Sequence, residues 1–178
     1  MLNLDIDARG DCAHTLVDYG DELKNNKALL NAALIKANIL DRNVCILLMS
    51  MAMLETTTLN TAHRDTTKDD CTNGATNVSL FNLNTDMIKE LKFSYTNDFL
   101  NDPKNLYVIV HILITAIRLW GVNRLLNFVR GGRTAFNDGH SYGAADYRNT
   151  ILSIYKVVKS DISLMTDSRR VQIYLQHV

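Results

Sequence analysis

The segment RNVCILLMSMAMLE, residues 42–55, decides the fold of this chain. Its side chains are apolar on nearly every side, so it predicts a helix at the centre of the hydrophobic core. Asp41, directly before it, is a residue type that caps helix N-termini. The helix would end at Glu55, although the partial negative charge of a helix C-terminus disfavours a carboxylate there. Glu55 is therefore either a solvated helix end or a functional group.

The composition is that of one globular domain spanning residues 1–178. Of the 178 residues, 47% are hydrophobic and 21% are charged, which suits one core and is too little for two typical domains. Lys plus Arg and Asp plus Glu balance at 19 each, and the basic residues are scattered. This pattern argues against nucleic acid or an anionic membrane as a partner. The longest apolar segment, residues 106–122, is shorter than a membrane span and predicts a buried helix.

Most of the chain shows helical periodicity. Apolar residues recur at intervals of three and four in residues 11–25, 26–38 and 144–161. A proline at a first helical position predicts a helix from Pro103 to about Trp120. A shorter helix should follow and end at about Arg130, because two glycines come next.

Two polar segments interrupt the helices. Residues 56–84 are rich in Thr, Asn, Asp and Lys, and they include NVSLFNLN, residues 77–84, which predicts a strand or extended turn lining a cleft. The second segment, RGGRTAFNDGHSYG at 130–143, predicts a polar glycine-rich loop. The expected fold class is mainly α, with a central buried helix and a small irregular or β region along a cleft.

Glu55 and the acidic residues after it are the candidates for chemistry. Glycoside hydrolysis uses one carboxyl group that stays protonated and a second that stays ionised. Apolar packing and a helix C-terminus both raise the pKa of a carboxyl group, which suits Glu55 to the first role. The segment HRDTTKDD offers the second from Asp65, Asp69 or Asp70, beside two basic residues. The five histidines and three cysteines lack the spacing of a metal site, so we expect no metal and no cofactor.

Taken in order, these elements resemble the lysozyme and lytic transglycosylase superfamily. In that superfamily an apolar helix ends in the catalytic glutamate, and a late Gly-Gly…Tyr segment closes the cleft. More narrowly, MAMLETTTL, RDTTKDD, TNVSLFNLNTDMI and RGGRTAFNDGHSYGAADYRNTI resemble glycoside hydrolase family 134. That family comprises small β-1,4-mannanases with a lysozyme-like fold, and the resemblance covers roughly residues 40–160.

The resemblance implies an inverting endo-β-1,4-mannanase that degrades mannan and manno-oligosaccharides. Glu55 matches the general acid and Asp65 the general base. Asp69 is the alternative base, because this chain has a shorter, glycine-free form of the family's loop. The substrate-binding residues implied by the matching motifs are Thr56, Asn77, Phe81, Asn82 and Tyr142. The rival interpretations are a lysozyme- or chitosanase-like hydrolase of an aminosugar polymer and a non-catalytic glycan-binding module.

An inverting mechanism also predicts a geometry. Its two carboxyl groups stand about 6.5–9.5 Å apart, because a water molecule must fit beside the sugar. We expect Glu55 and Asp65 to line one groove walled by residues 77–84 and 131–143.

The same interpretation predicts a secreted monomer, although residues 1–11 lack the basic and apolar regions of a signal peptide. Secretion would favour one disulfide. Cys45 lies within a predicted helix and should remain a free, buried thiol. Cys12 would then pair with Cys71.

Overall fold

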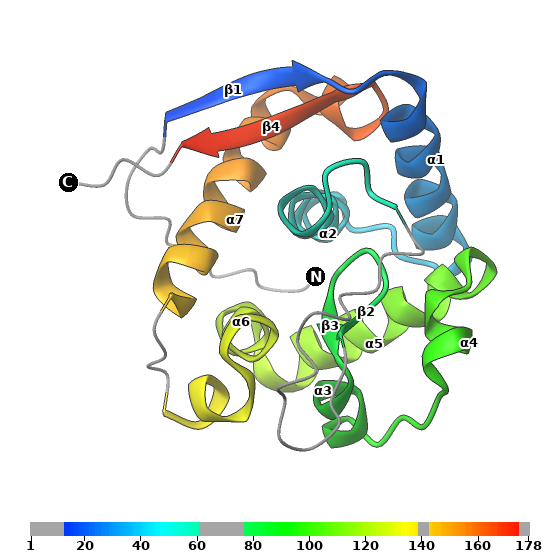
Figure 1. The fold of residues 1–178 in the computed structure, drawn as a ribbon, viewed down its shortest axis with the longest axis vertical. Coiled ribbons are helices and arrows are strands. Elements are labelled where there is room, and N and C mark those ends of the chain that lie inside the picture. Colours follow the sequence, from blue (N-terminus) through cyan, green and yellow to red (C-terminus); the bar gives the residue numbers. More distant parts are fainter. Residues whose placement is uncertain (1–12, 61–76, 139–142, 175–178) are drawn as a thin grey trace.

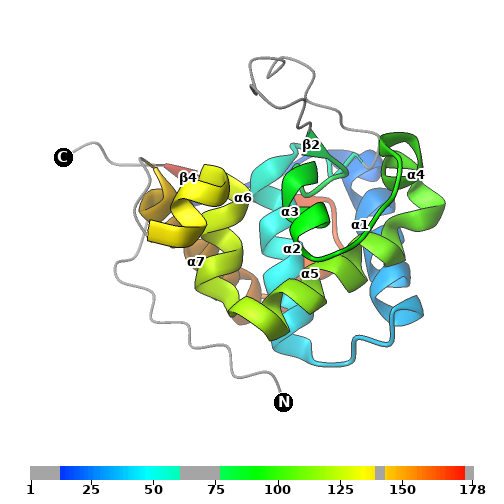
Figure 2. The ribbon, with the colours of Figure 1, turned by 90° about the horizontal axis from the view of Figure 1, so that it is seen from below.

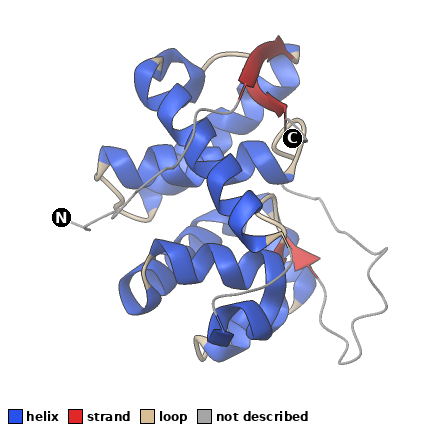
Figure 3. Cartoon of the chain, turned by 90° about the vertical axis from the view of Figure 1, so that its left-hand side faces the viewer, coloured by secondary structure: helices blue, strands red, loops and turns tan. Residues whose placement is uncertain are grey.

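The computed structural model describes residues 13–60, 77–138 and 143–174, and most of them are helical (Figures 1 and 3). In chain order the elements are β1 (Ala13–Asp18), α1 (Gly20–Lys36), α2 (Arg42–Glu55), β2 (Asn77–Val78), β3 (Leu83–Asn84), α3 (Thr85–Glu90), α4 (Asn97–Asn101), the 3-10 turn η1 (Pro103–Asn105), α5 (Leu106–Trp120), α6 (Val122–Asp138), α7 (Ala144–Ser160), the 3-10 turn η2 (Ile162–Met165) and β4 (Arg169–Tyr174). The mainly α fold class is thus confirmed.

Helix α2 is the central element, as its sequence predicts. The Asp41 side chain accepts hydrogen bonds from the backbone N–H groups of Asn43 and Val44, at 2.9 and 3.4 Å. Every residue from 46 to 53 is buried. Figure 1 looks almost down this helix, with the other helices arranged around it. One cluster of buried hydrophobic side chains runs from Leu23 to Val171 and takes in all the longer helices.

The beginning of the chain differs from the prediction. Instead of a helix over residues 11–25, residues 13–18 form β1, and α1 begins only at Gly20. β1 pairs antiparallel with β4 near the other chain end, in a register that joins Ala13 to Tyr174 and Asp18 to Arg169. The pairing partner lies more than 150 residues away, so local periodicity gave no indication of it. The resulting ribbon, which we call the β1–β4 ribbon, runs beside α7 in Figure 1.

The second difference concerns the predicted glycine-rich loop. Helix α6 does break at Gly132, which has φ 64° and ψ −155°, but helical structure resumes and continues to Asp138. A ring cluster accounts for this continuation: Phe136 packs against Trp120 and Phe128, with ring centroids 4.7 and 5.3 Å apart. Apolar burial therefore outweighs the glycine signal after the break.

The segment 77–84 forms the extended turn that its sequence predicts. β2 and β3 pair through Asn77–Asn84 and Val78–Leu83 (Figure 1), and Figure 2 shows β2 next to α3. The Asn84 side chain caps α3 by accepting a 2.8 Å hydrogen bond from the Asp86 N–H. We call residues 77–84 the β2–β3 hairpin. All four of its apolar side chains are fully buried: Val78, Leu80, Phe81 and Leu83.

Helix α5 carries the long apolar segment and packs into the shared core, ending at Gly121 as predicted. Within the described ranges, no helix by itself is long and apolar enough to cross a membrane. Only Pro103–Trp120 and Val122–Asn137 taken together, bent by 116°, meet that test of length and composition.

Candidate active site

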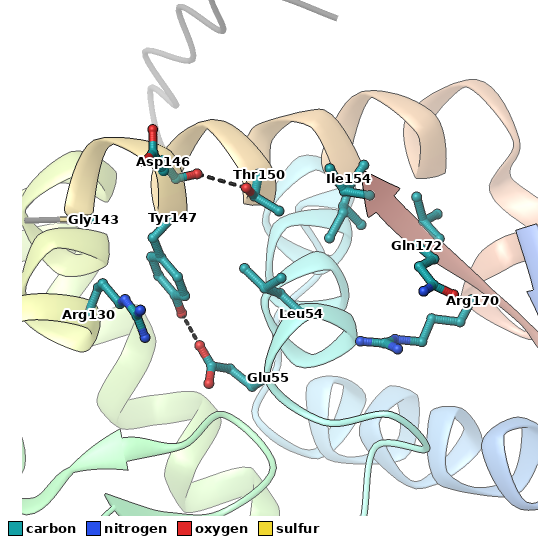
Figure 4. A pocket seen from close by; sticks show the side chains of 12 residues that line it. Leu54, Glu55, Arg130, Gly143, Asp146, Tyr147, Thr150, Ile154, Arg170 and Gln172 are labelled. Carbon is teal, nitrogen blue, oxygen red and sulfur yellow. Dashed lines mark hydrogen bonds between the residues drawn. The ribbon is translucent and has the colours of Figure 1, made fainter. Parts of the chain in front are cut away.

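Glu55 lies in the wall of a pocket of about 490 Å³, formed where α2 ends (Figure 4). Helix α7 and strand β4 supply most of the remaining wall, and Arg130 of α6 and Gly143 complete one end. The lining residues are Leu54, Glu55, Arg130, Gly143, Asp146, Tyr147, Thr150, Ile154, Arg170, Val171, Gln172 and Ile173. The pocket therefore combines apolar side chains, among them Leu54 and Ile154, with several polar side chains around one half-buried carboxyl group.

Tyr147 holds the Glu55 carboxyl group. Its hydroxyl donates a hydrogen bond to Oε1 of Glu55 across the interface between α7 and α2. Burial raises the pKa of Tyr147 well above its ordinary value, and the charge of Glu55 and this hydrogen bond raise it further. Tyr147 is thus a neutral hydrogen-bond donor at every working pH, and it fixes the direction in which Glu55 points.

Arg170 binds the end of α2 from the other side. Its Nε donates a 2.7 Å hydrogen bond to the carbonyl oxygen of Met53. This carbonyl belongs to the last turn, where helix acceptors lack partners and where a positive charge is favoured. Strand β4 thus places a positive charge at the C-terminus of α2, where the helix dipole and Glu55 both contribute negative charge.

Arg130 approaches Glu55 from α6. In Figure 4 its side chain points towards the Tyr147 hydroxyl and the Glu55 carboxyl group. Its charge also lowers the pKa of Tyr147, opposing the effects of burial and Glu55. The site therefore places a neutral donor and a cation on the same side of the carboxyl group.

The described residues do not establish which carboxylate is the general base. Asp65 and Asp69 both lie outside them, so the base and the expected carboxyl separation stay predictions. Asp146 is the other carboxylate among the residues that line this pocket, but its side chain points away from Glu55 in Figure 4. Its backbone carbonyl accepts a 2.8 Å hydrogen bond from Thr150.

Of the predicted substrate-binding residues, two are buried. Phe81 has no exposed surface, so its ring is not available to stack on a sugar, and we withdraw it as a binding residue. Its aromatic side chain serves the core because the apolar positions of the β2–β3 hairpin all face inward. Thr56 is 5% exposed, and its hydroxyl donates a 3.4 Å hydrogen bond to the carbonyl of Ala52, so it closes the end of α2.

Two of the remaining predicted binding residues, Asn77 and Asn82, are not among the residues that line this pocket. Asn77 and Asn82 are half-buried in the β2–β3 hairpin, and Oδ1 of Asn82 is a buried acceptor without a partner among the described residues. Tyr142 lies outside the described residues. The hairpin was expected to wall a groove shared by Glu55 and Asp65, and that groove stays a prediction because Asp65 lies outside the described residues. In the pocket described here, most of the remaining wall comes from α7 and β4. Gly143, from the other predicted wall, does line the pocket.

Sequence reasoning missed Tyr147, Arg130 and Arg170. Tyr147 carried a usable signal: it falls on the apolar face of a predicted helix, and a buried tyrosine hydroxyl usually finds a partner. The arginines carried none, because their neighbours at the site are remote in sequence. Cys45 is a free, half-buried thiol that donates to the carbonyl of Ile39 at 3.5 Å, whereas Cys12 and Cys71 lie outside the described residues.

Compared with protein-family models and with curated proteins, the chain matches none of them. Among the described residues, no group of three or more His, Cys, Asp or Glu side chains could hold a metal ion. The site offers a carboxyl group of fixed orientation in a pocket, able to give or take a proton.

Proposed function

We propose that the protein is an inverting endo-β-1,4-mannanase with a lysozyme-like fold, in which Glu55 is the general acid. The observation that carries the proposal is the position of Glu55, at the end of a buried central helix, in a pocket wall and oriented by Tyr147. The sequence resemblance described above supplies the substrate class. The pocket volume of about 490 Å³ is within the usual range for small-molecule sites.

The proposed reaction breaks the bond between the anomeric carbon and the glycosidic oxygen. Glu55 gives its proton to that oxygen, so the leaving sugar departs as a neutral alcohol. A water molecule attacks the anomeric carbon from the opposite face and loses a proton to Asp65. The new bond then has the inverted configuration. Glu55 ends the step as a carboxylate and Asp65 as a neutral acid. Before the next cycle Glu55 takes up a proton from solvent and Asp65 releases one to it.

Release of reducing ends from mannan, chitosan and peptidoglycan tests the proposal. We expect hydrolysis of mannan, with Glu55→Gln as the matched blank for contaminating activity. Release from chitosan or peptidoglycan alone would replace the mannanase by an aminosugar hydrolase. Binding to a glycan without release from any of the three would instead indicate a non-catalytic binding module.

The identity of the base is tested separately. Asp65→Asn should lose as much activity as a general base provides, about 10² to 10⁴-fold, and Asp69→Asn much less. The opposite order would assign the base to Asp69. NMR of the first product released from mannopentaose should show the α-anomer, and an initial β-anomer would mean a retaining mechanism.

A further inference from the structure

We propose that Arg130 is a positioning residue for Glu55: its guanidinium stabilises the carboxylate that Glu55 becomes when it has delivered its proton. The inference deepens the proposed function and rests on it for the catalytic role of Glu55. The effect of Arg130 on the ionisation of Glu55 can be measured whether or not any glycan is hydrolysed.

The backbone directs Arg130 to this place. Arg130 lies two residues before the break of α6 at Gly132, and Gly132 adopts a φ of 64° that glycine accepts readily. The arginine then crosses close to the start of α7: a Cβ atom on Gly143 would stand 3.7 Å from Nε of Arg130. Gly143 itself has a φ of 85° and lines the same pocket. Arg130, at the end of the first part of α6, therefore lies close to the start of α7.

Each element packed against the end of α2 contributes a different group. From α7, the Tyr147 hydroxyl donates to Glu55, while the Asp146 side chain points away. From β4, Arg170 is engaged with the Met53 carbonyl. From α1, Glu22 accepts a 2.9 Å hydrogen bond from the hydroxyl of Thr58.

Arg130 differs from these groups because it is a cation whose side chain extends towards the Tyr147 hydroxyl and the Glu55 carboxyl group (Figure 4). In the part of the chain that the structure describes, its guanidinium has no salt bridge to an acidic side chain. Its charge is therefore not neutralised by a described partner and acts on whatever carboxylate forms beside it. A nearby positive charge favours the ionised form of a carboxyl group. Proton delivery by Glu55 would thus be helped at the moment its negative charge develops.

The test is a pH titration of the Glu55 carboxyl carbon by NMR, with the resonance assigned by its loss in Glu55→Gln. In Arg130→Gln the titration midpoint should move upward by about half a unit to one unit, the low end of charge effects because Arg130 is exposed. Arg130→Lys keeps the charge and should move it by less than half as much. The alkaline limb of kcat/KM on any hydrolysed glycan should shift in the same direction.

Arg133→Gln is the matched control. Arg133 lies on the same helix beyond the break, is exposed, and pairs with Glu90 at 2.7 Å instead of facing the pocket. This variant removes the same charge and should leave the Glu55 midpoint unchanged. The proposal is overturned if Arg130→Gln leaves the midpoint in place, or if Arg133→Gln moves it equally. A protein that hydrolyses no glycan but shows the expected midpoint shifts would refute the enzymatic function and retain the electrostatic link.

Discussion

Two ionisable side chains, Lys27 and Glu55, lie against the apolar interior, but their surroundings differ: Lys27 is enclosed, whereas Glu55 faces a pocket. Lys27 is fully buried, and its ammonium group donates to the carbonyl oxygens of Leu164 and Arg169 at 2.6 and 2.5 Å. Asp167 stands 3.5 Å from it. Glu55 is half-buried, faces a pocket and is held by the hydroxyl of Tyr147.

The comparison separates a structural charge from one available for chemistry. Lys27 is enclosed by the backbone of η2 and the start of β4, so it fastens that turn onto α1. Burial lowers the pKa of Lys27 to about 8, and Asp167 opposes this effect. Glu55 has a polar partner and also has a space beside it in which another molecule could be bound.

Glu55→Gln should reduce turnover of the hydrolysed glycan by about 10² to 10⁴-fold, because an amide keeps the shape of the side chain but cannot donate an acidic proton. Steady-state rates measure this loss, and urea unfolding should show little change in stability. Glu90→Gln removes a carboxylate of a surface pair with Arg133 and should leave the rate unchanged. A loss below tenfold would remove Glu55 from the role of general acid.

Lys27→Met should lower the free energy of unfolding by about 2 kcal/mol, because two buried carbonyl groups lose their donor while the cost of burying a charge is relieved. Urea unfolding measures the change, with exposed Lys24 on the same helix, as Lys24→Met, for comparison. Turnover per folded molecule should be unaffected. A large fall in turnover with intact stability would contradict the structural role of Lys27.

Tyr147→Phe should reduce turnover about tenfold, the loss expected when a hydrogen bond of about 1.4 kcal/mol to the charged form of Glu55 is removed. Tyr155→Phe is the matched control on the same helix, since its hydroxyl donates to Asn43 at 3.0 Å, away from the pocket. Equal effects of the two variants on turnover would show that Tyr147 acts on packing alone.

The lowered pKa of Lys27 predicts a stability that rises with pH. Between about pH 8 and 10.5, the unfolded chain holds a proton that the folded protein has released, so raising the pH favours the folded state. The gain should approach about 1 kcal/mol for each pH unit in this window and vanish below it. The difference in unfolding free energy between the wild type and Lys27→Met, followed from pH 7.5 to 9.5, isolates this contribution. A flat difference would mean that the ammonium group keeps its ordinary affinity for protons.

The elements that could be predicted from sequence are those whose signals are local. The apolar run of α2 and its Asp41 cap indicate where that helix lies, and the apolar run that ends before Gly121 does the same for α5. β1 could not be predicted, because its strand state depends on pairing with β4. Residues 133–138 were mistaken for loop, because Phe136 finds its ring partners only after folding.

In the candidate site, too, the residue with a local signal could be predicted and those that depend on tertiary packing could not. Glu55 was identified because its own position, at the end of an apolar helix, is chemically unusual. Tyr147, Arg130 and Arg170 meet it only through the packing of α6, α7 and β4 around α2, which no local pattern encodes. Phe81 was assigned to the substrate site by its place in the matching motif, and a motif does not distinguish a side chain that faces a cleft from one that is buried in the core.

The β1–β4 ribbon also sets an order of events during folding. Its strands lie more than 150 residues apart in the chain. Bringing them together costs conformational entropy, and this cost is offset only when the non-local contacts between them form. Strand β4 carries four of the residues that line the Glu55 pocket, so this wall forms only after β4 has been synthesised and has paired with β1. The central helix precedes β4 in the chain, so the helix can form before the cavity beside its terminal glutamate has its second wall.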